Sequence, residues 1–194
     1  VAGDFIQMIP YNGEPASLES EVKILYDDYA LYIGAMLYDS SPDSIYTMLS
    51  RRDDLSMADY FGVFIDPFND ALYAYGFFVT AAGVQVDMKA SEFHQDRNWD
   101  AVWESAVEIT DSGWVVEMKI PYSALRIPTK ETQVWGLNTR RNIRRYRENT
   151  SWNFIDSKEQ GVNHQSGELV GIQNIEPPLR LSFVPYIAGY VQNN

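Results

Sequence analysis

Apolar and polar positions alternate with a period of two along most of the chain, which is the spacing of β-strands. In residues 31–38, Leu31, Ile33, Ala35 and Leu37 fall on one face. The intervening residues of this segment, which include Tyr32 and Tyr38, are also largely apolar. A strand that is apolar on both faces is typical of the centre of a sheet, so the pattern predicts a central strand here.

Two consecutive hairpins are predicted over residues 60–88. The segment 60–65 is followed by Asp66-Pro67-Phe68-Asn69-Asp70, whose Pro, Asn and Asp favour a turn, and the strand pattern resumes over 72–80. Gly83 accommodates the positive φ of a second turn, after which 84–88 alternates again. Three strands in a meander are expected.

The next segments alternate between loop and strand patterns. Residues 89–101 are polar and without period, which predicts a long surface loop, whereas 103–109 and 114–120 alternate around the turn 111–113. Residues 121–125 suit one helical turn, and 134–141 suits a further strand. Three tryptophans alternate with other strand residues and are predicted to lie in the core: Trp103, Trp114 and Trp135.

No long amphipathic helix is visible, and turn signals recur about every 8 to 12 residues. This pattern predicts an all-β fold, an antiparallel β-sandwich of the immunoglobulin-like or jelly-roll-like kind with at most short helical turns.

Length and composition narrow the function classes. The chain has 194 residues, enough to bury one substantial core, and its net charge of −12 argues against nucleic acid as a partner. Cysteine is absent, which excludes disulfides, thiolate zinc sites and cysteine nucleophiles. The aromatic content of 14% exceeds the needs of a minimal core and indicates a recognition surface.

The two ends of the chain carry separate expectations. Residues 1–176 are predicted to form the sandwich domain, with a truncated N-terminus, because the start lacks a signal-peptide pattern. Pro177 and Pro178 punctuate the chain, and the strand-like segment 179–191 has no partner after it. Residues 177–194 are therefore expected to be a linker and the start of a following module.

Several phrases, in the same order along residues 5–175, resemble family 9 carbohydrate-binding modules. The phrases are Val22 to Asp39, Phe61-Gly-Val-Phe-Ile-Asp66-Pro67, Gly76 to Asp87, Trp99-Asp-Ala-Val-Trp103, Gly113 to Arg126, Trp135-Gly-Leu-Asn138, and the arginine-rich segment Arg140 to Arg147. The resemblance implies a DOMON-like β-sandwich, a sugar-binding role and calcium sites.

A narrower resemblance rests on Phe5-Ile-Gln-Met-Ile-Pro10-Tyr-Asn-Gly13 and on the arginine-rich segment. Both are similar to a subgroup found at the N-terminus of large Bacteroidetes-type envelope proteins, where an outer-membrane β-barrel follows. Members are often labelled membrane-associated hydrolases. This resemblance implies a periplasmic or outer-membrane location in a Gram-negative cell.

Sugar rings need flat aromatic platforms with polar groups at their edge, and two tryptophans lie in polar, loop-like contexts. Trp99 and Trp152 are the candidates. The resemblance implies that a terminal sugar is held between two aromatic rings, with Trp152 near the place of one. The alternative is that both indoles close the ends of the sandwich.

Five of the 15 basic residues cluster in Arg140, Arg141, Arg144, Arg145 and Arg147. Strand alternation predicts Arg140 and Arg144 on one face and the other three on the opposite face. Ion pairing with Asp or Glu is one explanation, and a guanidinium fork that reads vicinal hydroxyls or an acidic sugar is the other. Arg140 and Arg144, with Asn138 on the same predicted strand, are the polar ligand-binding candidates.

Calcium needs several converging oxygen donors, and aspartates at strand ends or turns supply candidates. The candidate ligands are Asp27, Asp28, Asp66, Asp87 and Asp100. The spacing matches no EF-hand, and solvated turn carboxylates are the alternative.

Catalytic motifs for a serine hydrolase, a phosphate loop or a zinc protease are absent, so an enzyme would have to use carboxylates such as Glu104 and Glu117. The leading hypothesis is a noncatalytic module that captures a glycan. A structural or interaction domain without sugar binding, or part of a glycoside hydrolase, are the alternatives.

Overall fold

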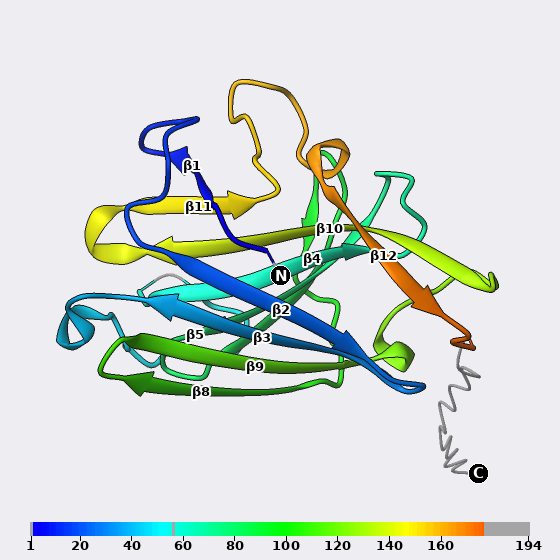
Figure 1. Ribbon diagram of the computed structural model, residues 1–194, viewed down its shortest axis with the longest axis horizontal. Helices are drawn as coiled ribbons and strands as arrows, with labels where there is room; N and C mark the ends of the chain where they lie inside the picture. The colour runs from blue at the N-terminus through cyan, green and yellow to red at the C-terminus, as the bar shows by residue number, and fades with distance from the viewer. Residues whose placement is uncertain (1, 56, 177–194) are drawn as a thin grey trace, which may run out of the picture.

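The computed structural model, which describes residues 2–55 and 57–176, contains two antiparallel sheets packed face to face (Figure 1). The larger sheet has eight strands: β1 (Ile6–Ile9), β4 (Tyr60–Asp66), β5 (Ala74–Thr80), β6 (Gln85–Ala90), β7 (Gln95–Asp96), β10 (Thr132–Ile143), β11 (Glu148–Trp152) and β12 (Gly167–Gln173). The smaller sheet has four: β2 (Ser20–Tyr26), β3 (Ala30–Tyr38), β8 (Glu104–Thr110) and β9 (Gly113–Pro121). The prediction of an all-β sandwich is confirmed.

Helical structure is limited to single turns. Four short 3₁₀ helices connect strands: η1 (Pro42–Ser44), η2 (Tyr122–Ala124), η3 (Arg144–Tyr146) and η4 (Asn163–Gln165). The helical turn expected at 121–125 is η2. Within the described ranges, no helix has the length and apolar character needed to cross a membrane.

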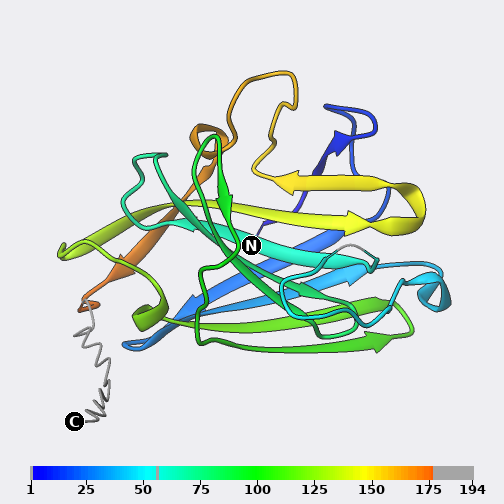
Figure 2. The ribbon, with the colours of Figure 1, turned by 180° about the vertical axis from the view of Figure 1, so that it is seen from behind.

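The longest strand, β10, organises the larger sheet, whose order is β1-β11-β10-β4-β5-β6-β7. One edge of β10 pairs with β4, while its other edge pairs first with β12 and then with β11. Both views of the ribbon show the β4–β5 turn, the β6–β7 turn and the β11–β12 segment extending from the same side of the molecule (Figures 1 and 2).

The meander predicted over 60–88 is β4, β5 and β6, and the hairpin around 111–113 is β8 and β9. Two boundaries differ. The strand expected from Leu72 begins at Ala74, because the amides of Ala71 and Leu72 donate to the side chains of Asp66 and Asp70 in the β4–β5 turn. The loop expected over 89–101 is interrupted by β7, which pairs with the end of β6.

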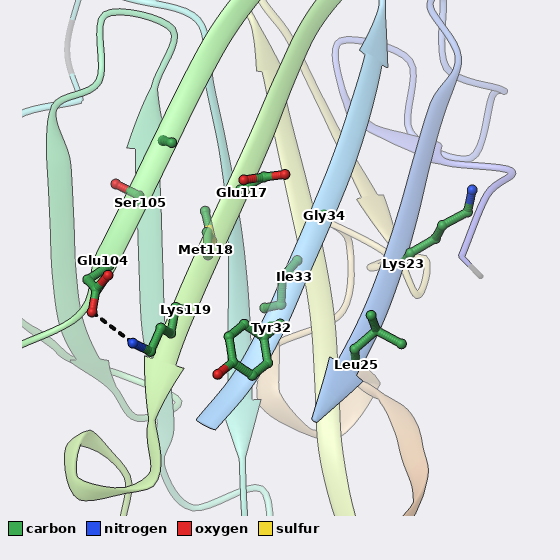
Figure 3. Close-up of a pocket in the computed structure, with 11 residues that line it drawn as sticks. Lys23, Leu25, Tyr32, Ile33, Gly34, Glu104, Ser105, Glu117, Met118 and Lys119 are labelled. Carbon is green, nitrogen blue, oxygen red and sulfur yellow. Dashed lines mark hydrogen bonds and ion pairs between the residues drawn. The ribbon is translucent and has the colours of Figure 1, made fainter. Parts of the chain in front are cut away.

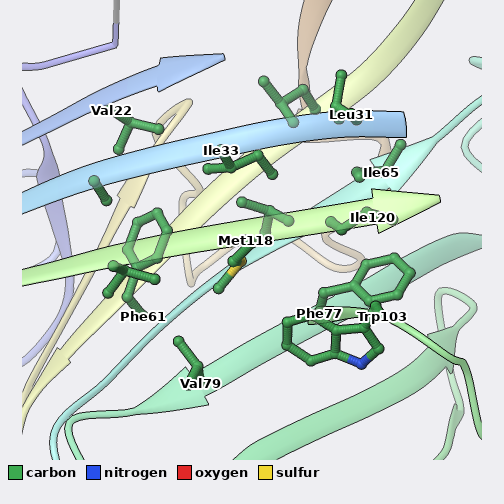
Figure 4. Packing of buried hydrophobic residues seen from close by; sticks show 14 of the residues in the cluster. Val22, Leu31, Ile33, Phe61, Ile65, Phe77, Val79, Trp103, Met118 and Ile120 are labelled. Carbon is green, nitrogen blue, oxygen red and sulfur yellow. The ribbon is translucent and has the colours of Figure 1, made fainter. Parts of the chain in front are cut away.

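The core lies between the two sheets, on the inward faces of both (Figure 4). Figure 4 shows Leu31, Ile33 and Met118 of the smaller sheet meeting Phe61 and Phe77 of the larger one. The three tryptophans predicted for the core, Trp103, Trp114 and Trp135, are buried as expected. Alternation accounts for Trp114 and Trp135, which lie on β9 and β10, whereas Trp103 precedes β8 and its indole donates to Asp87.

A second, smaller apolar cluster covers the outer face of the larger sheet, which is the face turned away from the smaller sheet. It contains Phe64, Ala74, Phe78, Val86, Met88 and Ala90. The ring of Phe78 lies across Gly62, where a Cβ atom would collide with it. Glycine at this position therefore lets an aromatic ring lie flat on the outer face.

One arginine of the basic cluster is anchored by a buried carboxylate. Arg145 donates two hydrogen bonds of 2.7 Å to Asp39, one from each terminal nitrogen. Burial by itself would raise the pKa of Asp39, but the bonds from Arg145 and from the Ser41 amide outweigh it, so the pKa lies below its ordinary value. Ion pairing, one of the two explanations offered for the cluster, therefore accounts for Arg145.

We expect Asp39→Asn to lower the free energy of unfolding by about 3 kcal/mol at neutral pH, because it leaves the partly buried Arg145 without its charge partner. A carboxylate whose pKa is lowered by folding contributes stability above the ordinary value of 3.8, and this contribution is lost as pH falls through the folded pKa. The difference from wild type should therefore shrink below pH 3.8. Urea unfolding across pH measures it, with the exposed Asp43→Asn as control. A difference that does not change with pH would contradict the assignment.

Candidate functional site

Strand β10 presents two kinds of side chain, one on each face. Asn138 and Arg140 are paired across to Phe64 and Gly62 of β4 on the outer face. Leu137 belongs to the core on the other face. Because side chains alternate along a strand, the same register that buries Leu137 turns Asn138 and Arg140 outward together.

Arg140 is a cation without a hydrogen-bond or ion-pair partner in the described residues, although it lies over an aromatic ring. Its guanidinium carbon lies 4.7 Å from the ring centroid of Phe64. Its Nε is buried and has no acceptor, and in the described part of the chain its side chain makes no hydrogen bond or ion pair. Burial lowers the pKa of this guanidinium, and Tyr60 acts in the opposite direction. In a protein of net charge −12, a half-buried arginine without a carboxylate is an unusual feature.

Asn138 supplies the complementary unsatisfied group. Its amide nitrogen donates to the carbonyl oxygen of Asn153 at 2.9 Å, while its buried Oδ1 has no donor. A donor that lacks an acceptor thus lies two residues along one strand face from an acceptor that lacks a donor. A hydroxyl group both donates and accepts, so this pair suits a polyhydroxylated ligand.

Positive charge gathers beside this pair. Burial raises the pKa of Tyr60, whereas the nearby cations Arg140, Arg97 and Arg144 favour its ionised form. The Tyr60 hydroxyl donates to Asn149 Oδ1 at 3.1 Å, which fixes the phenol. We call Asn138, Arg140, Tyr60 and Phe64 the Arg140 site.

Arg144 lies at the margin of the Arg140 site rather than beside Arg140 on a strand. Strand β10 ends at Ile143 and the chain continues as η3, so strand alternation does not extend to Arg144. Its backbone amide donates to Asp59 Oδ1 at 2.8 Å. The prediction that Arg140 and Arg144 share a strand face was wrong for this reason, although both cations influence Tyr60.

The two candidate platforms are placed differently. Trp99 packs against the main core, with its ring centroid 5.1 Å from that of Tyr75. Trp152 also packs against the core, and its carbonyl accepts from Thr139 Oγ1 at 3.2 Å, on the strand that carries Asn138. Both rings remain partly exposed, and no contact joins them in the described part. Trp152 is in register with Thr139 and therefore lies on the inward face of the larger sheet, opposite to the Arg140 site. Trp99 lies on the inward side of β5.

The candidate calcium ligands do not form one donor set. Asp27 accepts from the amides of Tyr29 and Ala30, and Asp66 accepts four backbone amides of its own turn. Asp28 is exposed. Within residues 2–55 and 57–176, no group of three or more acidic or histidine side chains is arranged to hold a metal ion.

Asp87 and Asp100 already flank a cation, the guanidinium of Arg52. Arg52 contacts Asp87 directly, and its Nε lies 3.9 Å from Asp100. Asp87 also accepts the Ala101 amide at 2.6 Å and the Trp103 indole at 3.2 Å. These two aspartates therefore tie the β7–β8 loop to β6. Calcium binding stays a prediction, which melting curves with calcium and with chelator test by mass action.

A shallow groove lies on the exposed face of the smaller sheet (Figure 3). Gly34 lies in register with Lys23 on one side and Glu117 on the other, so the centre of the groove has no side chain. Glu104 is ion-paired with Lys119 at 3.0 Å. Glu104 and Glu117 are both exposed on this open face, whereas glycoside hydrolysis needs two carboxyl groups that flank one bond.

The two antiparallel sheets thus form a β-sandwich with an unsatisfied donor and acceptor on the outer face of β10. The profile of the carbohydrate family 9 binding domain-like family matches residues 7–174, and the chain belongs to that family. No curated protein matches the chain.

Three solved structures share the fold. Two are of a family 9 carbohydrate-binding module from Caldicellulosiruptor kristjanssonii. The glucose complex has a TM-score of 0.59 and 16% identity, and the match covers 91% of this chain and 88% of that one. The cellotriose complex has a TM-score of 0.60 and 15% identity, with 91% and 89% covered. A proposed carbohydrate-binding protein from Bacteroides uniformis has a TM-score of 0.64 and 14% identity, with 86% and 85% covered.

Adjacent arginines on opposite faces of β10 make a matched pair for mutation. We expect Arg140→Met to change the free energy of unfolding by less than about 1 kcal/mol, because it removes the desolvation cost of an unpaired cation along with its contact to Phe64. Arg141→Met should cost about 3 kcal/mol or more, because Arg141 donates to the carbonyls of Glu19 and Tyr38 and to Ser20 Oγ. Chemical unfolding measures both, and equal losses would contradict the distinction.

Proposed function

We propose that this domain captures a glycan without catalysis, at the Arg140 site. The observation that carries the proposal is the pairing of an unsatisfied donor, Arg140 Nε, with an unsatisfied acceptor, Asn138 Oδ1, on one face of β10. Each buried unsatisfied group costs about 1–3 kcal/mol, so a ligand that supplies both an acceptor and a donor would recover part of this cost.

The partner chemistry follows from what surrounds these groups. Vicinal hydroxyls can accept from a guanidinium and donate to an amide oxygen at the same time. The partly exposed ring of Tyr60 adds apolar surface beside them, which suits the C–H face of a sugar ring. A glycan supplies both features.

The solved relatives support the ligand class. The two Caldicellulosiruptor structures hold glucose and cellotriose, and the Bacteroides protein is a proposed carbohydrate binder. These three structures are at most 16% identical in sequence to this chain. The residues of this chain therefore determine which sugar it binds. We further propose a cell-envelope location, in line with the resemblance to envelope proteins, which fractionation of the native host tests.

The test of glycan capture uses Arg140→Gln, which keeps a polar side chain but removes the positive charge and the forked donors of the guanidinium. A glycan array identifies a ligand, and calorimetry measures its affinity. We expect Arg140→Gln to weaken binding at least about tenfold, equivalent to about 1.4 kcal/mol. The exposed Arg51→Gln carries the same charge change and should bind like wild type.

An array on which no glycan binds, or equal affinity of Arg140→Gln and wild type, would overturn the proposal. The first result would favour a structural or interaction domain. The second would move the binding site elsewhere on the same domain.

We also propose that the partly exposed ring of Trp152, which packs against the main core on the inward face of the larger sheet, forms an aromatic platform at the end of the sandwich. Trp152→Phe keeps a flat ring, whereas Trp152→Leu keeps apolar volume without one. Because stacking needs the ring face, we expect the leucine variant to lose affinity for the array ligand and the phenylalanine variant to retain most of it. Thermal melts check that both variants are folded, and equal affinity of the two would rule out stacking.

A further inference from the structure

A second cleft lies at the end of β4 and β5, away from the Arg140 site. Its volume is about 570 Å³, and it is lined by the β4–β5 turn, by β6 and by the loop after η2. The residues that matter here are Asp66, Phe68, Tyr73, Tyr75, Lys89 and Arg126. The cleft, which is open to solvent on one side, is lined by both aromatic rings and charged groups.

The aromatic rings come from a turn whose backbone is held in place. Tyr73 is 64% exposed and Phe68 is 42% exposed. Asp66 accepts the amides of Phe68, Asn69, Asp70 and Ala71, and Ala71 has a φ of 60°. A non-glycine residue in the left-handed region persists only where its surroundings enforce it, so the turn presents its rings in a defined arrangement.

The two cations of the cleft have no carboxylate partner in the described part. The Lys89 ammonium lies 5.7 Å from the Tyr75 ring centroid and 5.3 Å from that of Trp99. Arg126 is exposed and makes no hydrogen bond or ion pair there. Trp99 thus packs against the Tyr75 ring and lies close to the Lys89 ammonium. The polar sequence context of Trp99 did not indicate this structural role.

The acidic groups of the cleft are already engaged. The Asp66 carboxylate receives two backbone amides on each oxygen, and Asp70 Oδ1 accepts the Leu72 amide at 2.9 Å. The free hydrogen-bonding capacity of the cleft therefore lies mainly in donors that carry positive charge.

We propose that this cleft is a second subsite, which binds a carboxylate-bearing sugar residue such as a uronic acid. The sugar ring stacks on Tyr73 and Tyr75, and its carboxylate binds Lys89 and Arg126 by charge-assisted hydrogen bonds. The inference shares with the proposed function only the ligand class, a glycan.

The subsite is separate from the Arg140 site along β4. Asp66 at the cleft and Gly62 opposite Arg140 are four residues apart, about 13 Å at the rise of a strand. Substitutions at one site therefore need not disturb the other, and the two proposals can be tested independently.

The test compares D-glucuronate with its neutral methyl ester, which keeps the ring and removes the charge. Chemical-shift titrations of the labelled domain measure both affinities. We expect wild type to bind glucuronate at least about fivefold more tightly than the ester, and to lose this preference as salt is added, because exposed charges are screened. Arg126→Gln and Lys89→Gln should each abolish the preference, while the exposed Arg51→Gln should leave it unchanged.

Arg126 is exposed, so its substitution does not threaten the fold, and it decides the result if Lys89→Gln is unstable. Absence of glucuronate binding, an equal affinity for the ester, or full binding by Arg126→Gln would overturn the subsite. Loss of glucuronate binding in Arg140→Gln would also overturn it, because the acid would then occupy the Arg140 site. If the neutral array ligand fails to bind while glucuronate binds as expected, only the Arg140 proposal fails.

Discussion

The register between β10 and β4 is the constraint on which the core and the candidate site both depend. It places Leu137 opposite Ile65 on the inward face and Arg140 opposite Gly62 on the outward face. A slip of one residue would exchange the two faces and bury Arg140 in the apolar core. The free energy of core packing therefore also holds Asn138 and Arg140 on the same, outer face of the larger sheet.

The arginines of the basic cluster, residues 140–147, have different roles although they are close in sequence. Arg145 is neutralised by Asp39, and both terminal nitrogens of Arg141 donate to backbone carbonyls of the strands and loops of the smaller sheet, while its Nε has no acceptor in the described residues. Arg140 has neither kind of partner. Because Arg141 and Arg145 make the contacts that stabilise this segment, Arg140 can remain unpaired without loss of the fold. An unpaired Arg140 is free to bind a ligand.

The cleft beside β5 uses a different arrangement of the same chemical components. Its rings come from a turn and its cations from β6 and from the loop after η2, so no single segment of sequence contains it. Together, the two proposals mean that the domain binds sugar hydroxyls at the Arg140 site and a sugar carboxylate at the cleft beside β5. Such a domain would select a glycan by its composition as well as by its shape.

Period-two alternation was enough to predict the sandwich, the meander from β4 to β6 and the burial of Trp114 and Trp135, because strand geometry is local and repeats every two residues. Alternation also predicted that Arg140 and Arg141 lie on opposite faces of one strand. It failed at Arg144, where the strand ends, and it could not show that Asp87 and Asp100 surround Arg52. Residues 177–194, expected to begin another module, lie outside the described residues. Which arginine is paired, which aspartate is saturated and which rings share a cleft depend on contacts between segments far apart in sequence, and only the tertiary structure decides those.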